Sequence, residues 1–191
     1  CCVQAGVRHL TVTSSGAAYG YHVDNPEWID EHDALRGNRE FAYSDHKRQI
    51  EELLSDFRQN HPQLQQLIFR PGILALKGSD SPFVFIWDQD VINAMEMGIR
   101  EDKSGIFNMA GDGALTMKQI AHKLNKPLLI LPVWLVKAAL QVEKWRGKPT
   151  GPEQVNFLRY RPVLANRRLK EEFGYQLTKT SAETFDYFVE T

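Results

Sequence analysis

The chain has 191 residues, 42% of them hydrophobic and 25% charged, which is the balance of a soluble globular protein. Its 23 basic and 24 acidic side chains give a formal net charge of -1, which excludes the basic footprint of a nucleic-acid-binding protein. Cys1 and Cys2 are adjacent and are the only cysteines, so a disulfide framework and a zinc knuckle are both excluded. This cysteine usage fits a cytoplasmic protein.

The chain enters a predicted strand almost at once. Alternating, β-branched residues predict this strand from about Arg8 to Thr13, and Ser14 and Ser15 follow it. No initiator methionine and no signal-peptide pattern precede the strand. We therefore expect the sequence to be the middle of a longer protein.

After a polar, turn-rich loop from Tyr21 to Arg39, the sequence predicts an amphipathic helix that ends at His61. Continued backwards, its apolar stripe reaches Lys47 and Tyr43, which are four residues apart. We therefore expect this pair to face the body of the protein. The stripe consists of Ile50, Leu53, Leu54 and Phe57.

The pair formed by Tyr43 and Lys47 has a chemical interpretation. A phenol, with its ordinary pKa of about 10, is a poor base at neutral pH, and a nearby ammonium favours its ionised form. A tyrosine with such a neighbour can take a proton from a hydroxyl or return one to a carbonyl. The spacing alone is weak evidence for this chemistry, since a tyrosine at a helix start and a solvated lysine would also produce it.

A second short strand is predicted at Leu67 to Phe69, where Pro71 and Gly72 follow. Strand, helix and strand in this order predict a βαβ unit with a parallel sheet and a right-handed crossover. Because the carboxyl ends of parallel strands share one edge, we expect Ser15 and Gly72 to meet there. Ligands of open α/β sheets bind at this edge.

The remaining sequence has an α+β pattern. A strand near Phe83 to Trp87 precedes a helix that Asp88 or Asp90 helps to start, and "GIFNMAG" predicts another short strand. Thr116 and Gln119 are expected to form a capping box at the start of a helix. Further helices are predicted near Val133 to Trp145, Asn166 to Phe173 and Ser181 to Val189.

The most apolar run of the chain, residues 127–140, is too short to span a bilayer. Peripheral membrane contact of this run stays open.

Several of these segments together resemble the extended short-chain dehydrogenases/reductases, also called the NAD-dependent epimerase/dehydratase family. The segments are "TVTSSGAAYG", "YSDHK", "IFRPG", "DQDV" and "FNMAGDGALTMKQIAHKL", in the family's order over most of the chain. The UDP-glucose 4-epimerase-like subgroup is the most similar. The resemblance implies an α/β fold: the second half of a doubly wound parallel, Rossmann-type sheet over residues 1–76, and a smaller α+β substrate-binding lobe over 77–191. Residues 83–100 would pack back on the Rossmann part.

The resemblance also implies roles for individual residues. Ser15 matches the catalytic hydroxyl, Tyr43 the catalytic acid/base, and Lys47 the lysine that assists the tyrosine and holds the nicotinamide ribose. The cofactor would be NAD or NADP. The turn whose backbone lies against the nicotinamide matches Pro71, Gly72 and Ile73.

The implied activity is NAD(P)-dependent epimerase/dehydratase chemistry at a secondary alcohol or ketone, with a nucleotide sugar as one candidate substrate. A simple reductase of a small carbonyl or steroid-like substrate and a non-catalytic nucleotide sensor are the alternatives. Family members often dimerise through a bundle that would include the Tyr43 helix. The family's Gly-rich N-terminal half is absent from this sequence, and the stretch after Gly72 is shorter than usual. The Gly111–Gly113 segment is expected to be a turn and not a dinucleotide site.

A few polar residues have two interpretations. Arg159 and Arg161, with Arg167 and Arg168, could bind a substrate diphosphate, but a solvated surface with ordinary ion pairs is favoured. Ser14 is expected to be structural, and Asp90 to cap a helix. The six histidines lack metal-ligand spacing, so no metal site is expected, and His46 is assigned to the surface.

Overall fold

The computed structural model of the chain describes residues 2–72, 82–127, 133–145 and 160–190. Its centre is a three-stranded parallel sheet in the order β1-β2-β3. Strand β1 is His9–Thr13, β2 is Gln65–Pro71 and β3 is Gly105–Met109. The parallel sheet and all three of these predicted strands are confirmed.

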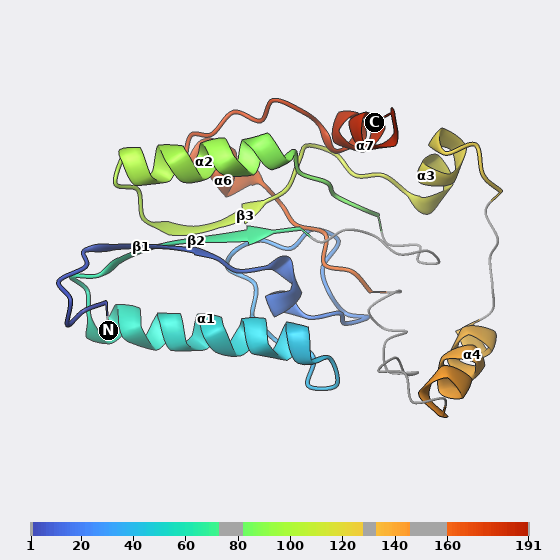
Figure 1. The fold of residues 1–191 in the computed structure, drawn as a ribbon, viewed down its shortest axis with the longest axis horizontal. Coiled ribbons are helices and arrows are strands. Elements are labelled where there is room, and N and C mark those ends of the chain that lie inside the picture. Colours follow the sequence, from blue (N-terminus) through green and yellow to red (C-terminus); the bar gives the residue numbers. More distant parts are fainter. Residues whose placement is uncertain (1, 73–81, 128–132, 146–159, 191) are drawn as a thin grey trace.

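Two helices connect the strands and cover opposite faces of the sheet (Figure 1). Helix α1, Ala42–Asn60, lies between β1 and β2 in the chain, and α2, Asp88–Arg100, lies between β2 and β3. The predicted βαβ unit is therefore present. Because the strands are parallel and in sequential order while the helices lie on opposite faces, the two connections have opposite handedness.

Side chains of β2 alternate between the two faces, as the pleat of a strand requires. Leu67 and Phe69 are fully buried and pack toward α2, in a cluster that includes Ala94 and Phe173. The edge of the Phe173 ring meets the Phe69 ring, with centroids 5.6 Å apart. The α2 face of the sheet therefore carries an apolar core cluster.

The face toward α1 is different, and here the predicted orientation of the helix is wrong. Ile50, Leu53 and Phe57 are 42%, 59% and 50% exposed, so the apolar stripe points away from the sheet. The residues of α1 that are buried are Ser44 and Glu51. Ser44 and Glu51 form hydrogen bonds with polar groups of the sheet and of the segment after β1. These contacts fix the rotation of the helix, and the sequence pattern did not reveal them.

The remaining predicted helices are present. Thr116 and Gln119 form the expected capping box, and the predicted helix at Asn166 to Phe173 is a short helix with Asn166 at its N-cap. Figure 1 shows α6 beside α2, and α4 at the end of the molecule away from β1. The elements are the 3-10 helix η1, Gly16–Tyr19; α3, Met117–Lys123; α4, Val133–Trp145; α6, Arg167–Glu171; and α7, Ser181–Glu190.

Two local predictions need correction. The segment Phe83 to Trp87 is not a strand of the sheet: Phe83 makes an isolated antiparallel bridge to Leu115. Asp90 does not cap α2, whose N-cap residue is Trp87. Its buried carboxylate instead accepts hydrogen bonds from the Tyr175 hydroxyl at 2.9 Å and from the Thr178 hydroxyl at 2.7 Å. Asp90 therefore anchors the segment that precedes α7. Tyr175, the nearer of its two partners in the sequence, is 85 residues away from Asp90.

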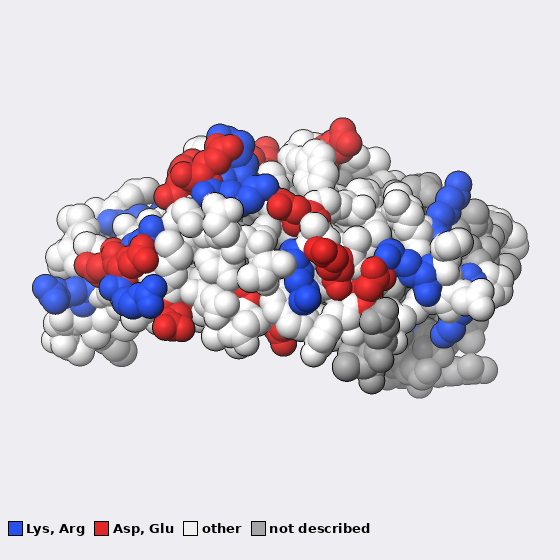
Figure 2. Space-filling view, turned by 90° about the horizontal axis from the view of Figure 1, so that it is seen from above, with Lys and Arg blue, Asp and Glu red and all other residues white. Residues whose placement is uncertain are grey.

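Other features agree with the sequence. Gly113 has a φ of +73°, as a turn at Gly111–Gly113 requires. The face that carries α2 and α7 shows basic and acidic side chains interspersed (Figure 2). None of the helices described is both long and apolar enough to cross a membrane. The predicted domain boundary at residue 76 stays a prediction. Strand β3 lies beyond this boundary in the chain and belongs to the same sheet as β1 and β2.

Candidate active site

The carboxyl end of β1 is where the predicted site residues gather. Lys47, on the first turns of α1, donates a hydrogen bond from Nζ to the carbonyl oxygen of Thr13, the last residue of β1, at 3.3 Å. Ser15 follows two residues later and is the N-cap of η1. The lysine and the serine are therefore at the same strand end, although 32 residues separate them in the sequence.

Tyr43 lies one turn before Lys47. The Lys47 Nζ atom is 5.8 Å from the centroid of the tyrosine ring, and 47% of Tyr43 is exposed. Phe41 contacts Tyr43 on one side and Tyr21 on the other, with ring centroids 6.1 and 5.8 Å apart. The accessible Tyr43 phenol therefore lies near the Lys47 ammonium and packs against Phe41. This arrangement does not require the apolar stripe of α1 to face the sheet.

The two serines after β1 have different surroundings. Ser15 is 3% exposed, and its Oγ accepts a hydrogen bond from the backbone N–H of Ala17 at 3.1 Å. Ser14 donates from Oγ to Glu51 of α1 at 2.5 Å, which agrees with the predicted structural role. Ser44, next to Tyr43, donates to the carbonyl of Ala17 at 2.7 Å. Helix α1 is therefore tied to η1 at its first turn.

A buried ion pair lies directly behind these residues. Arg70 of β2 contacts Glu51 of α1 through Nη2 and Oε2 at 2.5 Å, and the two side chains are 4% and 2% exposed. Burial alone would lower the pKa of Arg70, but the hydrogen bonds and charge of Glu51 raise it above its usual value. Arg70 also donates from Nη1 to the Tyr19 hydroxyl at 2.6 Å. The pair joins helix, sheet and η1.

The network continues to the third strand. The Tyr19 hydroxyl donates to Oδ1 of Asn108 at 2.9 Å, and the Asn108 N–H donates to Glu31 at 2.6 Å. Burial raises the pKa of Tyr19 to about 12, against the opposing charge of Arg70. Burial also raises the pKa of the Glu31 carboxyl. The side chains of Tyr19, Glu31, Arg70 and Asn108 are all buried, so a buried polar network lies beneath the site.

The carboxyl end of β2 closes the other side of the site. The Gly72 N–H donates to the carbonyl of Met109 at 3.0 Å. Gly72 and Gly16 line a narrow cavity of about 10 Å³, with Tyr21 and Arg161 among the other lining residues. The structure thus brings the ends of β1 and β2 to one edge, as predicted. Pro71 is the last residue of β2, whereas Ile73 lies outside the described residues.

Among the predicted phosphate ligands that the structure describes, Arg161 reaches this edge. It is 8% exposed, and its guanidinium carbon lies 4.3 Å from the centroid of the Phe83 ring. Burial lowers the pKa of Arg161 to about 10, and the charge of Tyr21 opposes that shift. At neutral pH a cation therefore remains beside the cavity. Arg159, its predicted companion, lies outside the described residues.

A wider cleft of about 550 Å³ opens next to Tyr21. Its wall is polar: Arg36 donates to Asp24 at 2.8 Å, and His22 Nε2 lies 2.7 Å from the Gly37 carbonyl. Tyr160, the first described residue after the gap, completes the wall. A cleft of this volume is within the range of small-molecule sites, but Ser15, Tyr43 and Lys47 are not among its lining residues.

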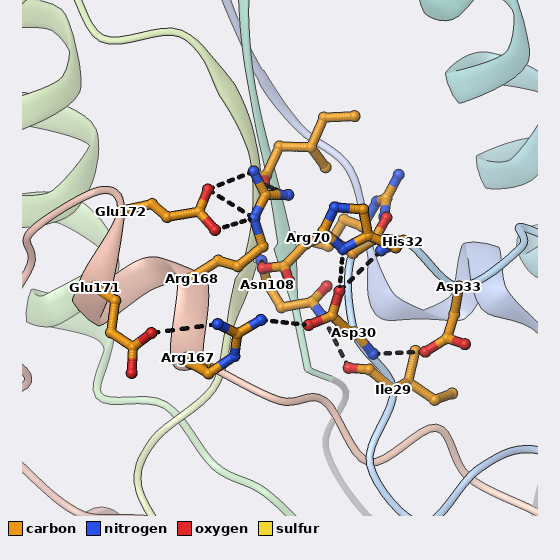
Figure 3. Close-up of polar contacts among 12 residues, drawn as sticks. Ile29, Asp30, His32, Asp33, Arg70, Asn108, Arg167, Arg168, Glu171 and Glu172 are labelled. Atoms are coloured by element: carbon orange, nitrogen blue, oxygen red, sulfur yellow. Dashed lines mark hydrogen bonds and ion pairs between the residues drawn. The ribbon is translucent and has the colours of Figure 1, made fainter.

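The remaining predicted arginines belong to a surface ion-pair cluster (Figure 3). Arg167 contacts Asp30 at 3.7 Å and Glu171 at 3.3 Å, while Arg168 contacts Glu172 at 2.7 Å. Burial opposes the shift, yet hydrogen bonds from His32 lower the pKa of Asp30. These contacts fasten the segment around Asp30 to α6, so Arg167 and Arg168 are used as surface ion pairs.

Metal ligation finds no support in the part of the chain that the structure describes. No group of three or more histidine, cysteine, aspartate or glutamate side chains is placed there to hold a metal ion. His46 is exposed, as predicted.

Sequence reasoning missed the network of Glu51, Arg70 and Asn108. One signal was present, since Glu51 stands seven residues after Ser44 and four after Lys47, on one face of α1. Asn108 and Glu31 gave no such signal, because their contact spans 77 residues.

Comparison with known proteins begins with the sequence. No profile of a known protein family matches the chain. Uncharacterized proteins of Mycobacterium bovis and Mycobacterium tuberculosis are 23% identical over 205 residues, which cover 95% of this chain and 54% of each relative. The chain therefore spans about half the length of the curated relatives it matches.

Solved structures give a clearer likeness. The UDP-glucose 4-epimerase of Thermus thermophilus in complex with NAD is 18% identical, with a TM-score of 0.67 over 99% of this chain and 65% of that one. The dTDP-glucose 4,6-dehydratase of Bacillus anthracis in complex with NAD is 14% identical, with a TM-score of 0.67 over 99% and 63%. A conserved protein of unknown function from Silicibacter pomeroyi is 19% identical, with a TM-score of 0.63 over 100% and 70%. The predicted Rossmann-type fold class is therefore confirmed.

Proposed function

We propose that the intact protein containing this chain is an NAD(P)-dependent oxidoreductase of the epimerase/dehydratase type that acts on a secondary alcohol or ketone. The observation that carries the proposal is the hydrogen bond from Lys47 to the Thr13 carbonyl at 3.3 Å, because it puts Lys47, with Tyr43 one turn before it, at the strand end that Ser15 follows. The likeness to NAD-bound epimerase and dehydratase structures supports the same chemistry.

The residues present fit a nicotinamide cofactor. Lys47 and Tyr43 both have solvent-accessible surface at the carboxyl edge of the sheet, where cofactors of doubly wound folds bind. Pro71 ends β2 and Gly72 follows it at the same edge, and in this proposal their backbone would lie against the nicotinamide. Among the described strands, β1 pairs only with β2. We assign the free edge of β1 to the remainder of the sheet, which would supply the phosphate-binding loop.

In this proposal a bound nicotinamide supplies the carbon that accepts or returns a hydride. Tyr43 removes the proton from the substrate hydroxyl in the oxidative direction and returns it to the carbonyl oxygen in the other. Ser15 accepts from the Ala17 N–H, which leaves its own hydroxyl hydrogen to stabilise the reacting oxygen. Lys47 stabilises the negative charge that develops on the Tyr43 oxygen and holds the ribose hydroxyls.

A nucleotide sugar is the substrate class that we favour. Arg161 keeps a buried positive charge beside the cavity between Gly16 and Gly72, and an arginine suits a phosphate group. The adjacent cleft of about 550 Å³ has the volume for a sugar and its polar substituents. Returning the hydride to the opposite face of the sugar would invert its configuration.

The test uses the intact protein. Calorimetry with NAD and with NADP measures cofactor binding, and a panel of nucleotide sugars is followed by NMR for epimer formation. Tyr43→Phe should lower kcat at least about 100-fold, the lower end of the usual contribution of general acid–base catalysis. Tyr187→Phe is the matched control, because Tyr187 is 44% exposed on α7 and Tyr43 is 47% exposed on α1.

Each result decides between the alternatives. Epimer formation without net consumption of NAD(P)H supports the epimerase, whereas net consumption points to a simple reductase. Failure of the intact protein to bind either cofactor, or unchanged kcat in Tyr43→Phe, would overturn the proposal.

A further inference from the structure

Ser44 is a buried serine whose hydroxyl does not cap its own helix. It follows Tyr43 directly, in the first turn of α1, and is fully buried. The N-cap residue of α1 is Phe41, whose side chain makes no capping hydrogen bond. The Ser44 hydroxyl donates instead to the carbonyl of Ala17 in η1, at 2.7 Å and across 27 residues of sequence. Because a buried hydroxyl requires a partner, this bond holds the first turn of α1 against η1.

Ala17 joins Ser44 to Ser15. Its N–H donates to the Ser15 hydroxyl oxygen at 3.1 Å, while its carbonyl accepts from Ser44 at 2.7 Å and from the N–H of Gly20 at 3.0 Å. Ala17 itself is fully buried. One buried residue therefore binds the Ser15 side chain through its N–H and the sequence neighbour of Tyr43 through its carbonyl.

Glu51 is a second anchor of α1, seven residues after Ser44 and on the same side of the helix. Its carboxylate accepts hydrogen bonds from two buried side chains, one on the sheet and one on the segment after β1. The two anchors are about 10 Å apart along the helix axis, so together they fix its rotation and its tilt. At about 100° per residue, Tyr43 and Lys47 both lie to one side of the line through the anchors. The anchors therefore determine the direction in which this pair points.

We propose that Ser44 is a positioning residue of the proposed active site, whose bond to Ala17 sets where the Tyr43 phenol lies relative to the Ser15 hydroxyl. This inference rests on the proposed function, in which both groups act on one oxygen of the substrate. Each group must come within about 2.6–3.2 Å of that oxygen, and a displacement of about 1 Å can cost a factor of about 100 in rate. Because Ser44 is buried, it acts through its neighbours and not on the substrate.

The experiment uses the intact protein and measures kcat and KM for the nucleotide sugar of the panel that the wild-type protein converts fastest. Ser44→Ala should lower kcat at least about tenfold and change KM by less than about twofold, because the substrate still binds while the two reacting groups are misplaced. Alanine is the strongest helix former, so the variant should keep α1. Circular dichroism checks that it is folded.

A double variant separates positioning from stability. If Ser44 aligns Tyr43 with Ser15, then Ser44→Ala should lower kcat by a much smaller factor in a protein that already carries Ser15→Ala, because no aligned pair is left to disturb. A role in stability alone would produce the same factor, or no change in kcat, in both backgrounds.

Ser181→Ala is the matched control. Ser181 is also fully buried at the start of a helix, α7, and its hydroxyl donates to the Gly113 carbonyl at 2.8 Å. This variant should lower the free energy of unfolding without changing kcat. If the wild-type protein is active and Ser44→Ala keeps its kcat, or loses the same factor with and without the Ser15 hydroxyl, this inference alone is overturned. If the wild-type protein binds neither NAD nor NADP, the proposed function fails and this inference fails with it.

Discussion

The Glu51 carboxylate of α1 and the Arg70 guanidinium of β2 form a buried ion pair, 2.5 Å between Oε2 and Nη2, directly behind the proposed catalytic residues. Ser14 and Tyr19 complete its hydrogen bonds from the loop that carries Ser15. The pair therefore determines how α1, with Tyr43 and Lys47, lies against the sheet.

Breaking this pair should cost much stability. Glu51→Met or Arg70→Met leaves a buried charge without its counter-ion, and we expect the free energy of unfolding to fall by about 3–5 kcal/mol. Urea unfolding followed by circular dichroism measures the change. The double variant Glu51→Met/Arg70→Met should lose less than the sum of the single variants, because it leaves no uncompensated charge. Glu96→Ala, at an exposed pair with Arg100, is the control and should change stability by at most about 0.5 kcal/mol. Additive losses in the double variant would contradict this account.

The exposed stripe of α1 predicts a homodimer of the intact protein. Leu53 and Phe57 are 59% and 50% exposed, and a contiguous apolar patch of this kind marks an interaction surface. Leu53→Asp with Phe57→Asp should halve the mass measured by light scattering. Ile92→Asp with Ile99→Asp is the control on α2, where both residues are more than half exposed, and it should leave the mass unchanged. A monomeric wild-type protein would rule out this use of the stripe.

Sequence periodicity predicted the existence and length of α1 but chose the wrong inward face. A 3.6-residue period reveals which residues share a face, while the inward direction depends on what the rest of the fold offers. Here the sheet offers Arg70 and Gln66, and Arg58 donates to Gln66 at 3.1 Å. The meeting of Ser15 with Lys47 could be predicted, because chain order fixes which strand ends share an edge. Contacts such as Asp90 to Thr178 span 88 residues, and no local pattern contains them.

Gly111 should tolerate no side chain. A Cβ atom there would meet the carbonyl oxygen of Phe85 and would lie 3.0 Å from the Ser181 nitrogen, both of them backbone atoms that cannot turn aside. Gly111→Ala should therefore lower the free energy of unfolding by about 2–3 kcal/mol. Gly113→Ala is the matched comparison: it has open space around it but a φ of +73°, and should cost about 1 kcal/mol. Urea titration of both variants checks the order, and a larger loss at Gly113 would contradict it.

Glu31 gives a pH-dependent prediction. Burial raises the pKa of its carboxyl, so the folded state binds this proton more tightly than the unfolded state does. Its contribution to stability is therefore fully present below the unfolded pKa, near pH 4, and is lost as pH rises through the folded pKa. Glu31→Gln removes the titration while keeping an acceptor for the Asn108 N–H. The stability of the variant relative to wild type should increase as pH rises above about 4.

A second glutamate supplies a control of opposite sign. Hydrogen bonds from Arg168 lower the pKa of Glu172, so its contribution is present above the unfolded pKa and lost as pH falls. The stability of Glu172→Gln relative to wild type should therefore decrease as pH rises toward about 4, the unfolded pKa of a glutamate, below the range in which Glu31 acts. Urea unfolding at a series of pH values measures both variants. If the two difference curves slope in the same direction, the assignment of a raised pKa to the Glu31 carboxyl is wrong, because only opposite shifts of the folded-state pKa produce opposite slopes.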